Sequence, residues 1–191
     1  MVEKTPLLIY GDFNCPFSAL ASARAVELEH RNDMIVEWRA VVHDPTVPRR
    51  GETVTAEQRA DFERELAQIR DLLAPGEADR FVVPSRRIDT TVVTDAYAAC
   101  PPEDRQKLRE RLFSAYWERG ENIGDPRVVR RLGGRGREEA LAASWRRDWL
   151  RRSKEPIVPM MVLPDGYVSR GLGVLARLRI LVGGAAELPT S

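Results

Sequence analysis

The sequence predicts an α/β fold in which a βαβ unit and a ββα unit are separated by a long helical block. Three observations lead to this prediction. Two short apolar runs, at residues 7–10 and 34–42, lie on either side of a helical pattern. Apolar residues then follow helical spacing from about residue 55 to residue 154. Finally, residues 157–169 have the pattern of a β-hairpin that precedes a last helix.

The N-terminal unit begins with a strand along the apolar run from Leu7, which ends in the segment from Gly11 to Asn14. The residues after Asn14 change to helical spacing, and Pro16 suits the first helical position because its φ is fixed and it lacks an N–H. A second strand is expected at residues 34–42. Because the connections are short, the two strands should be parallel and joined by a right-handed crossover.

The helical block is expected to contain five helices, each with its own start or stop signal. They should run from Thr55 to about Leu73, from about Asp89 to Cys100, from Pro101-Pro102 to Gly120, from Asp125 to Leu132, and along Leu141, Trp145 and Trp149. The hairpin then turns at Pro164-Asp165-Gly166, and a closing helix should end at Gly183-Gly184.

Composition narrows the class of protein. The chain has 191 residues, 43% of them hydrophobic, which suits one sizeable core. Its 30 basic and 29 acidic residues give a net charge of +1, so neither a nucleic acid nor a membrane surface is expected as a partner. The N-terminus shows no export signal, no run is long enough to span a bilayer, and only two cysteines are present. These features predict a protein of the reducing cytoplasm.

Cys15 is the main candidate for chemistry, because it lies where the first strand gives way to the first helix. Free N–H groups and the positive end of the helix dipole favour an anion at that position. Thiols in such places have pKa values lowered from about 8.5 to roughly 3.5–7.5. We therefore expect Cys15 to be a reactive thiolate.

The motif around this cysteine reads Cys15-Pro16-Phe17-Ser18. The Ser18 hydroxyl is able to donate a hydrogen bond to the thiolate, but it cannot attack a mixed disulfide to release it. The motif keeps a nucleophile and lacks a resolving thiol.

The order of elements, the Cys-Pro-Phe-Ser motif and the later Ile157-Val158-Pro159 together resemble the DsbA-like family. The stretch from Gln106 to Asp125 resembles the cytoplasmic branch of DsbA-like oxidoreductases. That branch is similar to 2-hydroxychromene-2-carboxylate isomerases and kappa-class glutathione transferases. The resemblance implies a thioredoxin fold at residues 1–48 and 155–186, with an all-helical insertion at residues 55–154.

The resemblance also implies roles for individual residues. Cys15 would be the attacking thiolate, and Pro159 would follow a cis peptide bond that leaves the Val158 backbone free to pair with a substrate. Pro16 and Phe17 would bind substrate beside them. Ser18 departs from the family pattern, because dithiol oxidoreductases have their second cysteine there.

Three functions follow from this combination. The first is a thiol-disulfide oxidoreductase that acts through Cys15 alone on a protein or glutathione disulfide, with no resident cofactor and with glutathione as a candidate co-substrate. The second is a glutathione-dependent isomerase or transferase in which Ser18 or Cys15 contacts the sulfur of glutathione. The third is a redox-inactive thioredoxin-fold protein that binds extended peptides. A symmetric homodimer is compatible with all three.

The other candidate residues have simpler interpretations. Cys100 ends a helix on an apolar face and is expected to be structural. The two histidines, His30 and His43, are too few and too poorly spaced for a zinc site, so no metal is expected. His43 follows the second strand and is more typical of a surface histidine, while Asp12 either tunes the site or shapes the turn.

Overall fold

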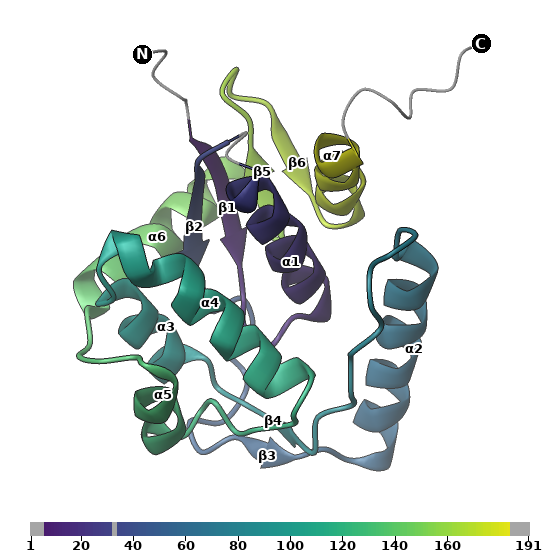
Figure 1. Cartoon of the computed structure of the whole chain (residues 1–191). Helices are drawn as coiled ribbons and strands as arrows, with labels where there is room; N and C mark the ends of the chain where they lie inside the picture. The colour runs from purple at the N-terminus through teal and green to yellow at the C-terminus, as the bar shows by residue number, and fades with distance from the viewer. Residues whose placement is uncertain (1–5, 32–33, 184–191) are drawn as a thin grey trace.

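The computed structural model describes residues 6–31 and 34–183. The predicted thioredoxin-like segments therefore include residues 1–5 and 184–186, which lie outside the described chain. A four-stranded sheet in the order β2-β1-β5-β6 forms the centre of the molecule (Figure 1). Its strands are β1 (Leu7–Gly11), β2 (Val36–Ala40), β5 (Met160–Val162) and β6 (Val168–Arg170). β1 and β2 are parallel, as predicted, and β5 is antiparallel to both β1 and β6.

The parallel pair fixes where the two strands end. Gly11 is paired with Ala40, so β1 and β2 finish at the same edge of the sheet. The ring of Trp38 lies directly against Gly11, and a Cβ at this position would come within 2.2 Å of the ring atom Cζ2. Glycine is therefore required for β1 to run this close to the Trp38 ring.

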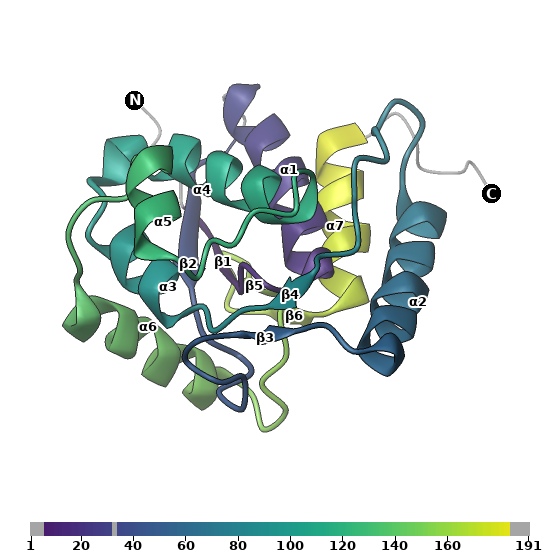
Figure 2. The same cartoon turned by 90° about the horizontal axis from the view of Figure 1, so that it is seen from below.

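Helices cover both faces of the sheet. α1 (Pro16–His30) packs against α7 (Leu172–Gly183) on one face, and α6 (Glu139–Arg152) lies on the opposite side next to β2 (Figure 2). The side chain of Arg24, only 2% exposed, crosses from α1 and donates to the carbonyl of Leu175 in α7. Its other donors bind the Leu72 carbonyl and the Glu77 carboxylate.

The insertion contains five helices, close to the predicted positions. They are α2 (Ala56–Leu72), α3 (Thr91–Ala98), α4 (Pro102–Trp117), α5 (Pro126–Leu132) and α6. Thr55 caps α2 in a capping box with Gln58, and the Asp125 side chain accepts from the N–H of Arg127 at the start of α5. Start signals read from the sequence are thus confirmed at both helices.

One element of this region was not predicted. β3 (Glu52–Thr53) pairs antiparallel with β4 (Arg86–Arg87), and β4 lies within residues 55–154. The insertion is therefore helical apart from this short strand. Strands of two residues are too short to show an alternating pattern, so neither strand is visible in the sequence.

A single buried cluster joins the sheet to the insertion. Phe113 of α4 contacts both Phe13 and Trp38, with ring centroids 4.9 and 5.7 Å apart. Trp145 and Trp149 of α6 are buried in the same cluster, as their spacing predicted.

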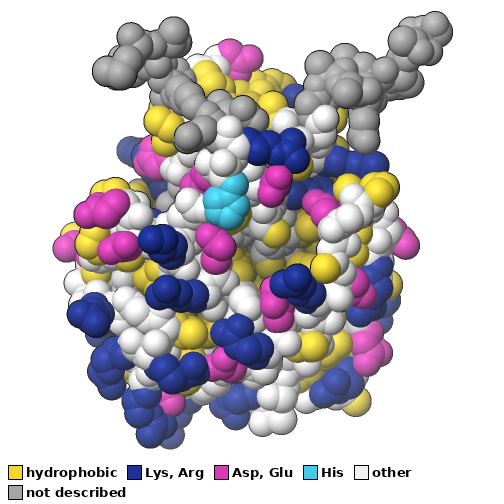
Figure 3. Space-filling model, in the orientation of Figure 1, with side chains coloured by type: hydrophobic (Ala, Val, Ile, Leu, Met, Phe, Trp, Pro, Cys, Tyr) yellow, Lys and Arg dark blue, Asp and Glu magenta, His cyan; other side chains and the backbone are white. Residues whose placement is uncertain are grey.

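On the face shown in Figure 3, basic and acidic side chains are interspersed. None of the described helices combines the length and the apolar composition needed to cross a membrane.

Candidate active site

Cys15 is the residue immediately before α1, as the sequence predicted, and Pro16 takes the first helical position. The side chain does not cap the helix with a hydrogen bond. It points instead toward the loop before β5, where Sγ lies 3.8 Å from the carbonyl oxygen of Val158 and donates to it. Cys15 is only 6% exposed, so its sulfur lies below the surface.

The loop that receives this sulfur has an unusual backbone. The peptide bond between Val158 and Pro159 is cis. The Pro159 carbonyl accepts from the N–H of Gly171, which ties the loop to the start of α7. The N–H of Val158 makes no hydrogen bond to any residue that the structure describes.

Burial governs the ionisation of Cys15. Desolvation raises the pKa of the thiol to about 11, while the nearby Ser18 hydroxyl and the N–H groups of the first turn act in the opposite direction. The expectation of a lowered pKa was therefore wrong. The argument from helix position left out the cost of removing a thiolate from water, which here exceeds the gain from the helix end.

Ser18 is fully buried, and its hydroxyl oxygen accepts from the backbone N–H of Asp12 at 3.3 Å. The hydroxyl hydrogen of Ser18 is free to be donated to the sulfur of Cys15, and this hydrogen bond acts to lower the Cys15 pKa. A serine in this place therefore supports the cysteine electrostatically without adding a second thiol.

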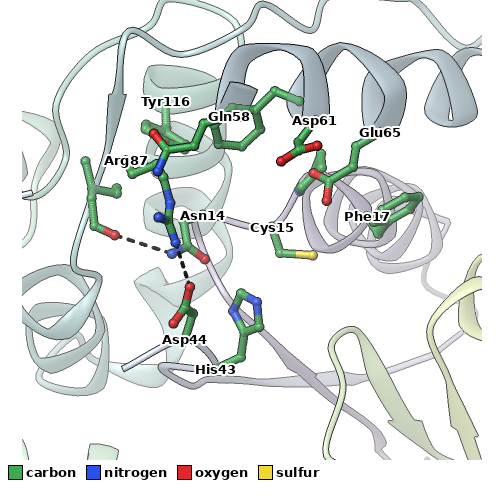
Figure 4. Close-up of a pocket in the computed structure, with 13 residues that line it drawn as sticks. Asn14, Cys15, Phe17, His43, Asp44, Gln58, Asp61, Glu65, Arg87 and Tyr116 are labelled. Atoms are coloured by element: carbon green, nitrogen blue, oxygen red, sulfur yellow. Dashed lines mark hydrogen bonds and ion pairs between the residues drawn. The ribbon is translucent and has the colours of Figure 1, made fainter. Parts of the chain in front are cut away.

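Cys15 lies at the wall of a pocket of about 300 Å³, formed where the end of the sheet meets the insertion (Figure 4). Pro16 and Phe17, expected to bind substrate, also line it. The remaining lining residues are Asn14, His43, Asp44, Gln58, Asp61, Phe62, Glu65, Arg87, Ile88 and Tyr116. Val158 and Pro159 are outside this lining, so they adjoin the pocket only through the bond from Cys15.

His43 is an exposed residue, as expected of a surface histidine, and its side chain, 35% exposed, also lines this pocket. Its backbone N–H and its Nδ1 both lie 2.8 Å from Oδ2 of Asp12, which is 0% exposed. The two residues follow β1 and β2, whose ends lie together in the sheet. The parallel pairing was predicted, and it was the signal that would have placed these residues side by side.

Acidic side chains of α2 form the opposite wall. Asp61 and Glu65 point into the pocket beside Cys15 (Figure 4). Burial and the neighbouring Asp61 raise the pKa of Glu65. Arg87 bridges Asp44 and Glu52 at 2.9 and 2.7 Å, so its charge is already balanced. Nothing in the sequence placed α2 near Cys15, because the two are far apart in the chain.

Cys100 does not line the pocket, and neither cysteine forms a disulfide. Cys100 is buried at the end of α3. Within residues 6–31 and 34–183, no group of histidine, cysteine and acidic side chains has the arrangement of a metal site.

The sequence model of the DSBA-like thioredoxin domain matches residues 7–140, well over half of the chain. The chain belongs to this family. The match includes β1, the Cys15 motif and most of the insertion, and it ends before the Val158-Pro159 loop. No curated protein matches the chain in sequence.

Solved structures of DSBA-like proteins share the fold over nearly the whole length. The cytosolic disulfide reductase DsbM from Pseudomonas aeruginosa, crystallised with GSH, has a TM-score of 0.68 at 18% identity and covers 94% of this chain and 96% of its own. A probable DsbA oxidoreductase from Streptomyces coelicolor has a TM-score of 0.66 at 16% identity, covering 97% and 93%.

A 2-hydroxychromene-2-carboxylate isomerase is also similar, with a TM-score of 0.61 at 18% identity, covering 92% of this chain and 93% of its own. Identities this low establish the fold and leave the reaction open. The recognised family and the fold class are thus both confirmed: a thioredoxin-like sheet with a largely helical insertion.

Proposed function

We propose that this protein is a thiol-disulfide oxidoreductase that acts through Cys15 alone. The observation that carries the proposal is the placement of one sulfur between a small pocket and the Val158-Pro159 loop, with Ser18 where a resolving cysteine would lie. An extended substrate could pair with the free N–H of Val158 while its sulfur faces Cys15.

The proposed reaction has two exchanges. In the first, the Cys15 thiolate attacks one sulfur of a substrate disulfide. A new S–S bond forms to Cys15, the substrate S–S bond breaks, and the departing sulfur leaves as a thiolate that takes up a proton. In the second, an external thiolate attacks the substrate sulfur of this adduct, which restores Cys15 and leaves a new mixed disulfide. Electrons flow from the external thiol to the substrate.

Glutathione is the external thiol that we propose. A cavity of about 300 Å³ lies at the lower end of the range for small-molecule sites, which suits a tripeptide thiol. The DsbM structure contains GSH in a protein of the same fold. A site without its own resolving thiol depends on a reducing pool, so we also propose that the protein works in the cytoplasm.

The test is adduct formation. Reduced protein is mixed with oxidised glutathione and its mass is measured, with Cys15→Ser and Cys100→Ser as paired variants. We expect a glutathione adduct on the wild type and on Cys100→Ser, none on Cys15→Ser, and release of the adduct by reduced glutathione. A wild-type protein that forms no adduct, and that reduces no small disulfide in the presence of glutathione, would disprove the proposal.

One observation favours a second candidate, a glutathione-dependent isomerase or transferase. The pocket lies between the sheet and the helical insertion and includes Phe17, Phe62 and Tyr116, an arrangement that suits an aromatic substrate. Such an enzyme needs only a hydrogen-bond donor for the glutathione sulfur. Cys15→Ser would then retain turnover, whereas thiol-disulfide exchange would be lost. Peptide binding without either reaction would identify the redox-inactive binding protein instead.

A further inference from the structure

We propose that His43 accepts the proton of the Cys15 thiol and that Asp12 positions it for this task. The inference rests on the proposed function, since it names the base that makes Cys15 a nucleophile. It starts from a requirement of the site: a sulfur that is 6% exposed and bonded through its hydrogen to the Val158 carbonyl is held as a thiol at rest. Exchange needs the thiolate, so the proton must be passed to a group within the pocket.

The bond to Asp12 determines which ring nitrogen of His43 is free. Nδ1 lies 2.8 Å from Oδ2 of Asp12. A carboxylate has no hydrogen to donate, so in the neutral ring Nδ1 carries the hydrogen that Asp12 accepts. The backbone N–H of His43 binds the same oxygen and fixes the ring's position. Nε2 is then left with a lone pair. His43 and Cys15 line the same pocket, and Figure 4 draws both side chains at its wall.

A carboxylate, an imidazole and a nucleophile in this order have the logic of a catalytic triad. The S–H bond breaks, a bond forms between Nε2 and the proton, and the electron pair stays on sulfur. The imidazolium beside the new thiolate lowers the cost of forming a charge in a buried place. After the exchange, the imidazolium returns the proton to the departing sulfur.

Several charged groups surround His43. They are Asp12 from the segment after β1, Asp44 from its own loop, Asp61 and Glu65 from α2, and Arg87 from β4. Burial lowers the pKa of the imidazole, but the bond to Asp12 and the nearby acidic charges outweigh it and the pKa is raised. Glu65 is the competing base, because its carboxylate also faces the pocket and makes no ion pair with a described residue.

The experiment measures the rate of Cys15 alkylation by iodoacetamide from pH 5 to pH 11 in roughly half-unit steps across the titration range of histidine and cysteine. If His43 is the base, the wild-type rate rises in two steps, the first belonging to the coupled pair. His43→Gln should lose the first step and react at least about tenfold more slowly at neutral pH. His30→Gln, at an exposed histidine of α1, is the matched control and should keep both steps.

Two further variants distinguish the residue that accepts the proton from residues that only hold it in place. In Asp12→Asn the first step should move to lower pH, because Asp12 raises the His43 pKa. Glu65→Gln should keep the first step. A His43→Gln profile that superimposes on the wild type would overturn the inference, and so would loss of the first step in Glu65→Gln alone.

A second measurement needs no change at His43. The chain has two histidines, so each imidazole C–H signal in an NMR titration is assigned with His30→Gln. Replacing the thiol in Cys15→Ala should shift the titration midpoint of His43, and coincident curves would overturn the inference. Alkylation does not require a disulfide substrate. A His43-dependent profile without glutathione exchange would therefore refute the proposed function alone, and exchange with a His43-independent profile would refute only this inference.

Discussion

At residue 18 a single oxygen replaces a sulfur, and this one atom separates two modes of thiol chemistry. The Ser18 hydroxyl accepts from the N–H of Asp12 and influences the Cys15 sulfur, so it stabilises the site while remaining inert toward disulfides. The Cys15 motif was visible in the sequence because each of its residues has a positional meaning at a helix start. The pKa of Cys15 was not, because it depends on burial by residues distant in the chain.

Ser18→Cys should convert the protein to a dithiol mechanism. A thiol one helical turn from Cys15 reacts with a high effective concentration, so the lifetime of the glutathione adduct should fall by at least about tenfold. The adduct is followed by mass spectrometry after excess glutathione is removed. Ser22→Cys, one turn further along α1, serves as the control and should leave the lifetime unchanged. Equal adduct lifetimes in Ser18→Cys and the wild type would contradict the prediction.

For helices and strands, the start signals carried by neighbouring residues were confirmed. Contacts between elements far apart in the chain were not predicted. Thr55 and Asp125 marked the starts of α2 and α5, because a capping side chain binds N–H groups within its own turn. The β3–β4 pair and the position of α2 beside Cys15 depend on long-range pairing, which has no periodic signature. The contact of His43 with Asp12 was partly predictable, because it follows from two predicted strands that end together.

Arg24 connects α1, α2 and α7, and its ion pair with Glu77 makes the stability of the fold depend on pH. Burial raises the pKa of Glu77, but its bonds to Arg24 and to the Ala74 N–H outweigh this and lower it overall. A carboxylate with a lowered pKa stabilises the fold above its unfolded pKa of about 4.3 and loses that effect as pH falls through its folded pKa.

Glu77→Gln should therefore reduce the free energy of unfolding at pH 7 by about 1–3 kcal/mol, because a buried guanidinium loses its counter-charge. The difference from the wild type should shrink as the pH is lowered below about 4. Urea denaturation at several pH values measures this. Glu63→Gln, an exposed glutamate of α2, is the comparison and should be neutral. A loss of stability that stays constant between pH 7 and pH 3 would argue against the ion pair as its cause.

For the molecule as a whole, the site exists only where the thioredoxin-like part and the insertion meet. The thioredoxin-like part supplies Cys15 and His43, and the insertion supplies the opposite wall. Among the bonds that join the two parts at this boundary, the indole N–H of Trp117 in α4 donates to the carbonyl of Phe13 at 2.9 Å. The order of the elements was predictable, but this junction was not, because 104 residues separate its partners.

Trp117→Phe should weaken that junction. The substitution keeps an aromatic ring but leaves the Phe13 carbonyl without its donor, which should cost about 1–3 kcal/mol of stability. Because Phe13 is two residues before Cys15, the alkylation rate of Cys15 should change as well. Trp149→Phe, whose indole bonds the Ile157 carbonyl at 3.3 Å, provides a comparison at another large buried residue. An alkylation rate equal to the wild type in Trp117→Phe would show that the junction does not position the site.

The depth of Cys15 has one more consequence. Oxidation of a thiol by dissolved peroxide to sulfinic and sulfonic acids depends on the exposure of the sulfur and on its thiolate character. In this structure the Cys15 sulfur has little of either, since it is 6% exposed and its pKa is raised to about 11. The same burial that makes a base necessary in the proposed exchange would also protect Cys15 from irreversible oxidation.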